Sequence, residues 1–472
     1  MRINPWALPL VLLGAAIVAL LVRDLSDPAA LALAGLSAVI ALSGAIQSAA
    51  HELRPAAAAF YVFWFAWLGV GPIAQLTLGR VAWNDTRALA DPAAVRLALV
   101  LTALAIAFFA IGDLATRARV RAPRPEARAS IRRVVHGIVV AALVVVGVNA
   151  VNVLGLNSLF ASRNARGDAL DAAGGSLSDA GGVVYALYTV LPAGLAIAAA
   201  LLGVYRLQLA WRGLAHVRVS EMGLLLVGVV GIALFANPFS QTRFIALLAL
   251  GSLVLAAVRP RSPRAGFAFL ALGIAATLLI YPLANVFRRG TLSFGSITAN
   301  TFVSPDFDGF QQVVNTLSYV QTHGFAGGHH LVSAVLFFVP RSVWADKATI
   351  ASADVAKHAG YSFTNLSLPV HAELYLQFGI AGLVVGMLLL GVLAARVDSA
   401  WLHAPLSKWA MLAPLVSMAM FGILRGPLGA QVPAYLPAIL ILLVAIRSSP
   451  RTRALPDATE QPSYDLQPVG AR

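Results

Sequence analysis

The sequence contains no cysteine, and only 11% of its 472 residues are charged. The absence of cysteine excludes disulfides, thiolate nucleophiles and cysteine-ligated metal sites. Any segment outside a membrane must therefore be held by packing and hydrogen bonds. The scarcity of charge, together with 59% hydrophobic residues, excludes an ordinary soluble globular protein. We expect most of the chain to be surrounded by lipid.

Lysine is also rare, so the formal net charge of +14 comes almost entirely from arginine. The arginines stand in short clusters between apolar runs, a pattern that sets the orientation of membrane proteins. The charge therefore indicates topology, and it does not indicate nucleic acid as a partner. The first apolar run is long and lacks a convincing cleavage site, so we interpret it as a retained span and not as a signal peptide.

Twelve apolar runs approach the roughly 20 residues that a helix needs to cross a bilayer. They predict an all-α polytopic membrane protein, with one transmembrane domain over residues 1–447 and both termini in the cytoplasm. In this topology the larger share of the 34 Lys and Arg residues lies inside, as the positive-inside rule requires. The runs lie near residues 6–22, 28–47, 56–78, 97–116, 134–154, 183–205, 221–236, 244–258, 266–286, 371–395, 408–424 and 433–446.

Two segments on the outer side are longer than turns. The first, residues 155–182, carries charges among glycines and is predicted to be an irregular loop. The second, residues 288–369, lies between the ninth and tenth spans. Within it, apolar residues over 310–320 recur at helical spacing and predict an amphipathic helix in the membrane interface. The apolar run 331–339 is too short to span, so we expect it to dip into the membrane edge or to pack on other helices. Residues 448–472 are proline-rich and predict a disordered cytoplasmic tail.

Several cations are predicted at the outer ends of spans, against the positive-inside trend. Each of them alone could simply reach the outer head groups. Their number favours a phosphate site, because guanidinium groups bind phosphate in a forked, charge-assisted geometry without a metal. Pro340 is expected to end the short apolar run and to bring the next two cations to the membrane surface. The candidates are Arg243, Arg288, Arg289, Arg341, Lys347 and Arg425.

His371, Glu373 and Tyr375 open the tenth span. On a helix His371 and Tyr375 share a face and Glu373 points elsewhere, whereas an extended entry after Pro369 would align all three. A carboxylate or imidazole shielded from water at the mouth of a span is a candidate general base. The alternative for Glu373 is a simple ion pair with one of the arginines.

Two other polar patterns are weaker signals. Asp306 and Asp308 have the spacing of a divalent-ion site for sugar nucleotides, which are not expected on the outer side. The adjacent His329 and His330 lack the ligand spacing of a metal site, so we expect a loop tip and no metal.

Two features of the spans have structural explanations. Asp27 is expected to cap the second span at Pro28. Gly379, Gly382 and Gly386 are expected to serve close helix packing.

Three short pieces carry a resemblance to a known family. They are Thr242 to Leu248, with its polar-Arg start; Pro340 to Lys347, with a Pro-Arg-x-x-Trp-x-x-Lys pattern; and Glu373 to Gly382, with a Glu-x-Tyr-x-x-Phe-Gly-x-x-Gly pattern. In this order, and with a large outer segment before the third piece, the second half of the chain resembles bacterial O-antigen (Wzy-type) oligosaccharide repeat-unit polymerases. These polymerases are related to the O-antigen ligases.

The resemblance implies a GT-C-like membrane glycosyltransferase that needs no cofactor. Its substrates would be oligosaccharides linked to undecaprenyl diphosphate, joined at the outer face of the bacterial cytoplasmic membrane. The cations named above would hold the departing diphosphate, and Glu373 or His371 would take the proton from the attacking hydroxyl. Tyr375 would contact substrate. The bilayer, a flippase and a chain-length regulator are the other expected partners.

Some family members carry an arginine followed by glycine eleven positions later in both enlarged outer segments. Arg163 and Gly174 fit that spacing, so Arg163 is a further substrate-binding candidate. The arginines of the second segment have no such glycine, so a two-loop capture scheme has no support here. Related ligases show His close to Asn before a similar span, and His371 has no Asn beside it. This difference favours a polymerase.

Two alternatives remain. A ligase would move finished glycan from the same lipid carrier to another acceptor, and it shares almost every feature above. Twelve spans with both ends inside also describe secondary transporters, including glycan flippases. Transporters place polar sites near the bilayer midplane, whereas the charges here gather at the outer ends and in one asymmetric segment.

Overall fold

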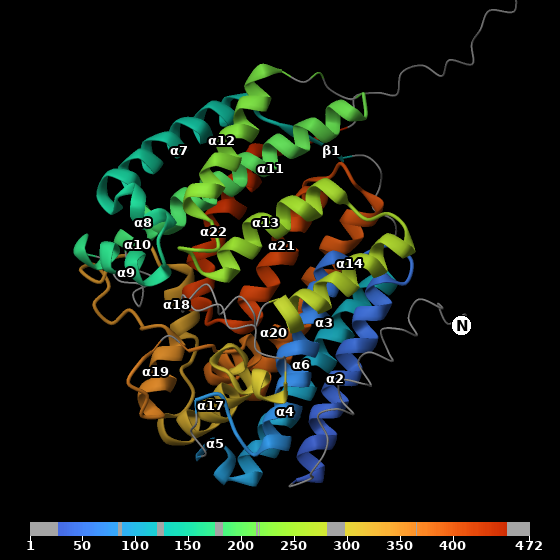
Figure 1. Ribbon diagram of the computed structural model, residues 1–472. Coiled ribbons are helices and arrows are strands. Elements are labelled where there is room, and N and C mark those ends of the chain that lie inside the picture. The colour runs from blue at the N-terminus through green and yellow to red at the C-terminus, as the bar shows by residue number, and fades with distance from the viewer. Residues whose placement is uncertain are drawn as a thin grey trace, which may run out of the picture.

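The computed structural model describes residues 27–83, 87–119, 127–174, 183–213, 216, 218–280, 298–364 and 366–450 (Figure 1). Within these ranges, eight helices are long and apolar enough to cross a membrane. They are α2 (Pro28–Ala49), the run from α3 (Pro55–Phe63) through η1 (Trp64–Val70) to α4 (Gly71–Leu78), α6 (Pro92–Arg119), α7 (Arg133–Leu154), η2 (Ala186–Val190) with α11 (Leu191–Trp211), α20 (Val370–His403), α21 (Lys408–Arg425) and α22 (Leu428–Ala445).

Three further apolar helices are shorter: α12 (Val219–Phe235), α13 (Arg243–Val258) and α14 (Pro263–Ala275), the last continued by η3 (Ala276–Ile280). These eleven helices correspond to eleven of the twelve predicted runs. The first run, 6–22, lies outside the described residues. The chain is therefore a helical, multi-pass membrane protein.

Asp27 caps the second predicted span, as expected. Its carboxylate accepts the N–H groups of Ala29 and Ala30 at 3.1 Å each, and Pro28 occupies the first helical turn. Arg96, near the start of α6, donates to the same carboxylate at 3.0 Å. The pKa of the Asp27 carboxyl group is lowered, mainly because the N–H of Ala30 donates to it. The contact ties the start of α2 to the start of α6.

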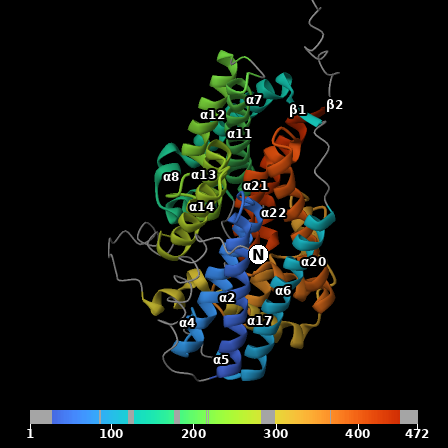
Figure 2. The ribbon, with the colours of Figure 1, turned by 90° about the vertical axis from the view of Figure 1, so that its right-hand side faces the viewer.

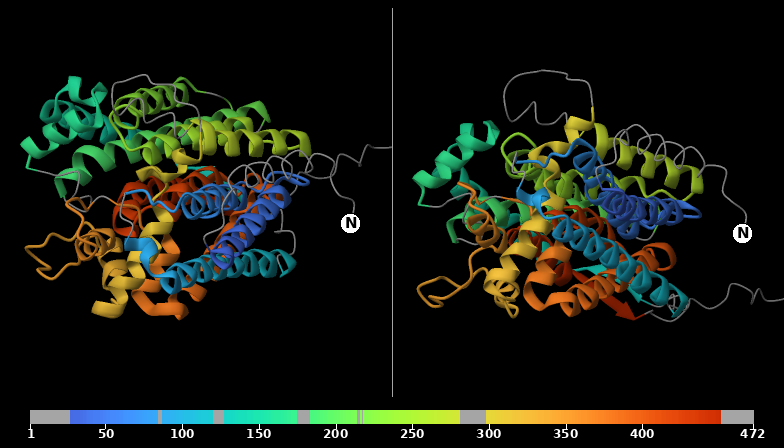
Figure 3. Two further views of the ribbon diagram at one scale, coloured as in Figure 1. Left: turned by 60° about the horizontal axis from the view of Figure 1, so that its bottom comes forward. Right: turned by 90° about the horizontal axis from the view of Figure 1, so that it is seen from below.

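The helices lie in two groups (Figure 3). In the left view the green helices from α7 to α14 form a layer over the red and blue helices. α11 contacts α7, α12, α13 and α22, whereas α2 contacts α3 and α6, and α20 contacts α6 and α21. The run from Pro55 to Leu78 is buried throughout its most apolar stretch. This aromatic-rich run is the most enclosed part of the core.

Two short strands join at one end of the bundle (Figure 2). β1 (Ala127–Ile131) pairs antiparallel with β2 (Ile446–Pro450), with Ile131 opposite Ile446. The link between the fourth and fifth predicted spans and the start of the predicted tail thus form a ribbon. Both segments leave the bundle at the same end, so each supplies the main-chain partners that the other needs.

The segment over residues 155–182 is helical in its described part, where an irregular loop was predicted. It contains α8 (Leu156–Phe160) and α9 (Arg163–Ala172), and Ser162 caps α9 through a hydrogen bond to the N–H of Ala165. The buried side of α9 consists of Arg166, Gly167 and Leu170. The glycine content of the segment concealed this one-sided pattern.

The second long segment contains η4 (Ala299–Val303), η5 (Pro305–Phe307), α17 (Gly309–His323), α18 (His329–Val335) and α19 (Ala351–His358). The helix predicted over 310–320 is present as α17, but its interfacial position was predicted wrongly. Its polar side is buried as well, because α19 and the following residues cover it: Tyr361 accepts hydrogen bonds from Gln311 at 2.7 Å and Asn315 at 3.2 Å. The apolar run 331–339 packs on α22 through α18 and exposes Val332, Val335 and Phe338.

α20 is kinked eight residues after it begins. Phe378 and Gly379 have non-helical dihedral angles, and φ of Gly379 is +65°, which favours glycine. The carbonyls that the kink releases are bound by a neighbouring turn, since Ala326 N–H donates to Leu376 O and Gly327 N–H to Gln377 O, both at 2.9 Å. Gly379 therefore serves the kink. Added Cβ atoms at Gly382 and Gly386 would meet the side chains of Phe378 and Leu374 in the same helix, so these glycines accommodate the bend and not a second helix.

Candidate functional site

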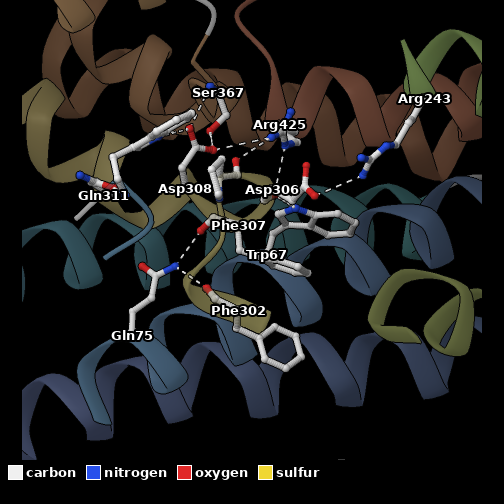
Figure 4. Close-up of polar contacts among 12 residues, drawn as sticks. Trp67, Gln75, Arg243, Phe302, Asp306, Phe307, Asp308, Gln311, Ser367 and Arg425 are labelled. Carbon is white, nitrogen blue, oxygen red and sulfur yellow. Dashed lines mark hydrogen bonds and ion pairs between the residues drawn. The ribbon is translucent and has the colours of Figure 1, made fainter. Parts of the chain in front are cut away.

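Asp306 and Asp308 each bind an arginine that the sequence singled out (Figure 4). An Oδ atom of Asp306 lies 3.2 Å from Nη1 of Arg243, and one of Asp308 lies 3.7 Å from Nη2 of Arg425. Arg243 begins α13 and Arg425 ends α21, so the two helix ends meet at η5. We call these four residues the paired cluster.

The main chain of η5 is held by side chains of the buried aromatic run. Trp67 donates from Nε1 to the carbonyl of Asp306 at 2.8 Å, and its ring stacks on Phe307 with centroids 5.3 Å apart. Gln75 donates from Nε2 to the carbonyls of Phe302 at 2.9 Å and Phe307 at 2.8 Å (Figure 4). These buried hydrogen bonds fix the turn that presents both carboxylates.

Asp308 is completely buried and has partners from three other segments of the chain. Trp83 donates to it from Nε1 at 3.1 Å, and Ser367 donates from both its hydroxyl and its N–H. Arg425 adds an ion pair at 3.7 Å. Arg425 also donates to the carbonyls of Asp306 and Pro305. The Asp306 carboxylate thus pairs with an arginine, and the Asp308 carboxylate binds an arginine, one indole and one hydroxyl, so protein groups account for both carboxylates.

Arg243 and Arg425 both contact the segment from Asp306 to Asp308, and their charges face carboxylates. Their side chains keep 18% and 20% of their surface exposed. A phosphate arriving here would have to share these guanidinium groups with Asp306 and Asp308. Arg288 and Arg289 lie outside the described residues.

Glu373 is fully buried in the short first part of α20. One carboxylate oxygen accepts the N–H of Leu428, at the start of α22, at 2.7 Å. The other oxygen has no hydrogen-bond partner, and the described residues provide no ion pair for this carboxylate. Simple pairing with an arginine therefore does not explain Glu373. An isolated buried carboxyl group is costly in a membrane protein and marks a functional candidate.

His371 faces a different set of neighbours. Its Nε2 lies 3.2 Å from Oγ1 of Thr102, and its ring centroid lies 5.1 Å from that of Trp64. Since the Thr102 hydroxyl already donates to the carbonyl of Ala98, Nε2 of His371 must be the donor. Its Nδ1 has no partner among the described residues. This segment is helical, so His371 and Glu373 point apart, and the extended alternative does not apply.

A chain of hydrogen bonds that sequence reasoning missed begins one turn after Glu373. Gly328 N–H donates to Oε1 of Gln377 at 3.1 Å, which fixes the orientation of that amide. Its Nε2 then donates to Nδ1 of His330 at 3.0 Å, and Nε2 of His330 donates to Asp354 at 3.0 Å. Burial opposes the charge of Asp354, but hydrogen bonds from His330 and Thr349 outweigh it and lower the pKa of this carboxyl group.

His330 lines a cavity of about 490 Å³ together with three cations, Arg341, Lys347 and Lys357. We call it the cationic cavity. Arg341 donates to the carbonyl of Lys347 at 2.5 Å, and the buried Lys347 ammonium donates to the carbonyls of Phe337 at 2.6 Å and Val339 at 3.1 Å. These bonds orient the two cations. Gly429 also lines the cavity and directly follows Leu428, the residue that binds Glu373.

No local pattern in the sequence predicts this arrangement. His330 was expected at a loop tip, whereas it is buried in the first turn of α18. Its partner Asp354 comes 24 residues later, on α19. Tyr375, predicted to contact substrate, packs on Phe325 with ring centroids 5.7 Å apart and does not line the cationic cavity.

Arg163 begins α9 and does not line the cationic cavity. Its neighbour Arg166 is the more enclosed residue, with 1% of its surface exposed. Arg166 donates from Nη1 to the hydroxyl of Ser240 at 3.1 Å, three residues before Arg243. Burial lowers the pKa of Arg166 to about 10. The segment containing α9 is thereby tied to the link that precedes Arg243.

Comparisons of this chain with protein-family models, with curated proteins and with solved structures found no significant match.

Proposed function

We propose that this protein is a membrane glycosyltransferase that polymerises undecaprenyl-diphosphate-linked oligosaccharide repeat units. In this proposal the chain crosses the bacterial cytoplasmic membrane twelve times, both termini are cytoplasmic, and the paired cluster and the cationic cavity face outward. The product would be an O-antigen, a capsule or an exopolysaccharide. The proposal needs no cofactor.

The observation that carries the proposal is an unpaired, buried Glu373 beside a cavity lined by three cations. Leu428 binds Glu373, and the next residue, Gly429, lines the cavity. A reaction whose leaving group is a diphosphate needs fixed positive charge where negative charge develops. It also needs a base for the attacking hydroxyl, and a carboxylate kept from water suits that task.

In the proposed reaction, the acceptor hydroxyl oxygen forms a bond to the anomeric carbon of the donor. The bond between that carbon and the diphosphate oxygen breaks, and the diphosphate leaves with the bonding electrons. Glu373 accepts the proton of the attacking hydroxyl. Arg341, Lys347 and Lys357 stabilise the charge that collects on the diphosphate.

The paired cluster has a different part in this proposal. Arg243 and Arg425 could join the diphosphate only by giving up contacts to Asp306 and Asp308. We therefore assign the first contact with the diphosphate to the cationic cavity. Arg288 and Arg289 remain expected ligands on the basis of the sequence alone.

The test is glycan chain length in a strain lacking the gene, before and after restoration, with lipid-linked and final-acceptor pools separated. Single repeats on the final acceptor that become a ladder on restoration would support a polymerase. Long glycan trapped on the lipid carrier would indicate a ligase, and repeat units trapped on the cytoplasmic face would indicate a flippase.

Variants then test the site itself. An Arg341→Ala protein that inserts normally in the membrane is expected to make no polymer longer than one repeat. Arg243→Ala is expected to have this effect only if the paired cluster opens during the reaction. Wild-type chain lengths in both variants would contradict a diphosphate role for these arginines.

A further inference from the structure

A second basic recess lies at the other end of the bundle. It has a volume of about 450 Å³, and its lining includes Glu52, Arg212, Arg259, Arg261 and Trp401. We call it the Arg259 recess. Arg259 follows the last residue of α13, whereas Arg243 begins that helix, so the recess and the paired cluster are separated by the whole of α13, about 24 Å for its 16 residues.

Arg259 is held in a strained conformation. Among the described residues it is the one non-glycine with a positive φ, 41°, a backbone region that glycine normally occupies. Such strain persists where the surroundings enforce it, and it is found at functional sites. Here the residue ends α13 and turns its guanidinium group toward Trp401.

The surroundings fix this guanidinium group without neutralising it. Its carbon lies 4.2 Å from the centre of the Trp401 ring, and it donates to the carbonyls of Trp401 and Pro405. None of these partners is a carboxylate. Burial, together with the charges of Arg212 and Arg261, lowers the pKa of Arg259 to about 10, so the group stays charged at neutral pH.

Positive charge dominates the recess. Arg212, Arg259 and Arg261 line it together with a single carboxylate, Glu52. The described residues form no ion pair within this group, although Glu52 attracts Arg259 at longer range. Three guanidinium groups gathered without bound counter-charges are an arrangement that an anion would stabilise.

The position of the recess indicates where the anion comes from. Trp211 precedes Arg212 and is 81% exposed, as expected for a tryptophan at the boundary between lipid and water. The recess also collects residues from four separate links or helix ends, at Glu52, Arg212, Arg259 to Arg261 and Trp401 to Pro405. Basic pockets between helices at a membrane surface bind the phosphates of lipid head groups.

We propose that the Arg259 recess binds a phosphate group at the membrane face opposite the paired cluster, and that the phosphate belongs to an anionic phospholipid. The same chemistry would accept a soluble phosphate, and the experiment separates the two sources. This inference does not depend on the glycosyltransferase proposal. It predicts a lipid contact that orders the links after α11 and α13.

The experiment measures phosphatidylglycerol retained by the purified full-length protein, by native mass spectrometry, with phosphatidylcholine as the neutral comparison. The test variant is Arg259→Gly, because glycine keeps the positive φ while the guanidinium group is removed. Arg212→Ala is the second variant. The control is Arg119→Ala, which removes an exposed arginine at the end of α6 that does not line the recess.

Each of the two test variants is expected to bind phosphatidylglycerol about tenfold more weakly, and the control to bind it as the wild type does. Retention that resists millimolar inorganic phosphate supports a lipid source, and displacement by inorganic phosphate supports a soluble anion at the same site. Equal binding by the wild type and both test variants, each eluting as a folded monodisperse protein, would overturn the proposal.

Discussion

The paired cluster and the cationic cavity use the same kinds of cation in different ways. In the paired cluster, Arg243 faces the carboxylate of Asp306 on η5, and Arg425 faces that of Asp308, which directly follows η5. In the cationic cavity, Arg341 and Lys347 donate to main-chain carbonyls. A carboxylate both orients and neutralises a cation, whereas a carbonyl orients it and leaves its charge available. Whether a group of arginines can bind an anion therefore depends on their partners, and carboxylate partners argue against it.

The largest expected effect concerns Glu373. Its carboxylate accepts the N–H of Leu428, which lies in the sequence between Arg425 of the paired cluster and Gly429 of the cationic cavity. We expect Glu373→Gln to lower the polymerisation rate by a factor of about 10² to 10⁴, the range for loss of a general base. Membrane insertion should be unchanged, because the amide can still accept the Leu428 N–H. The measurement is the rate of chain extension on lipid-linked substrate in purified membranes.

His371→Gln is the matched variant for this experiment, since His371 is buried in the same short helix but contacts Thr102 and Trp64. We expect it to retain most of the activity. The opposite result, a large loss in His371→Gln and none in Glu373→Gln, would transfer the role of base to His371.

The next largest effect should be the loss of a carboxylate from the paired cluster. Asp308→Asn removes the fully buried charge that faces Arg425, and breaking a buried pair costs about 3–5 kcal/mol. We therefore expect a large drop in thermal stability in detergent.

Asp346→Asn is the control, because Asp346 is an exposed aspartate of the segment that borders the cationic cavity. It should unfold like the wild type. An Asp308→Asn protein as stable as this control would mean that the paired cluster does not hold the helix ends together.

The cationic cavity should show the reverse pattern, with a loss of function and no loss of stability. Lys357 is exposed and lines the cavity, so Lys357→Ala removes charge without disturbing packing. We expect kcat/KM to fall about tenfold, equivalent to about 1.4 kcal/mol, with an unchanged melting temperature. Arg80→Ala removes an exposed arginine of the link between α4 and α6 and should leave both values unchanged. Equal losses in the two variants would indicate a general effect of surface charge.

The helices could be predicted because lipid imposes a simple rule on them. A run of about 20 apolar residues has few alternatives to a membrane helix, and eleven of the twelve predicted runs coincide with helices. The segments outside the spans obey no such rule. At the kink near Gly379, the free carbonyls of α20 accept hydrogen bonds from the turn at Ala326. This turn lies about 50 residues earlier in the chain, so a local pattern cannot predict the contact.

The candidate site was predictable in its residue types and not in its pairings. The sequence singled out Arg243, Arg425 and Glu373 as candidates, but it could not assign Asp306 and Asp308 to the arginines. That pairing requires α13, α21 and η5 to meet, which is a property of the packed bundle. The pairing of His330 with Asp354 could not be predicted either, because the two residues are 24 positions apart and neither belongs to a local pattern.

The smallest expected effect concerns Asp354, the carboxylate that orients His330 at the cationic cavity. Hydrogen bonds lower its pKa below the ordinary value of 3.8, so its contribution to stability is fully present above about pH 4 and is lost as the pH falls through the lowered pKa. Asp354→Asn should therefore reduce the free energy of unfolding by about 1 kcal/mol at pH 6, and by less below pH 4. Melting curves between pH 3 and 7 would measure this, with Asp171→Asn, an exposed aspartate of α9, as the control. A difference between wild type and Asp354→Asn that stays constant across this range would mean that packing, and not the charge of Asp354, holds His330 in place.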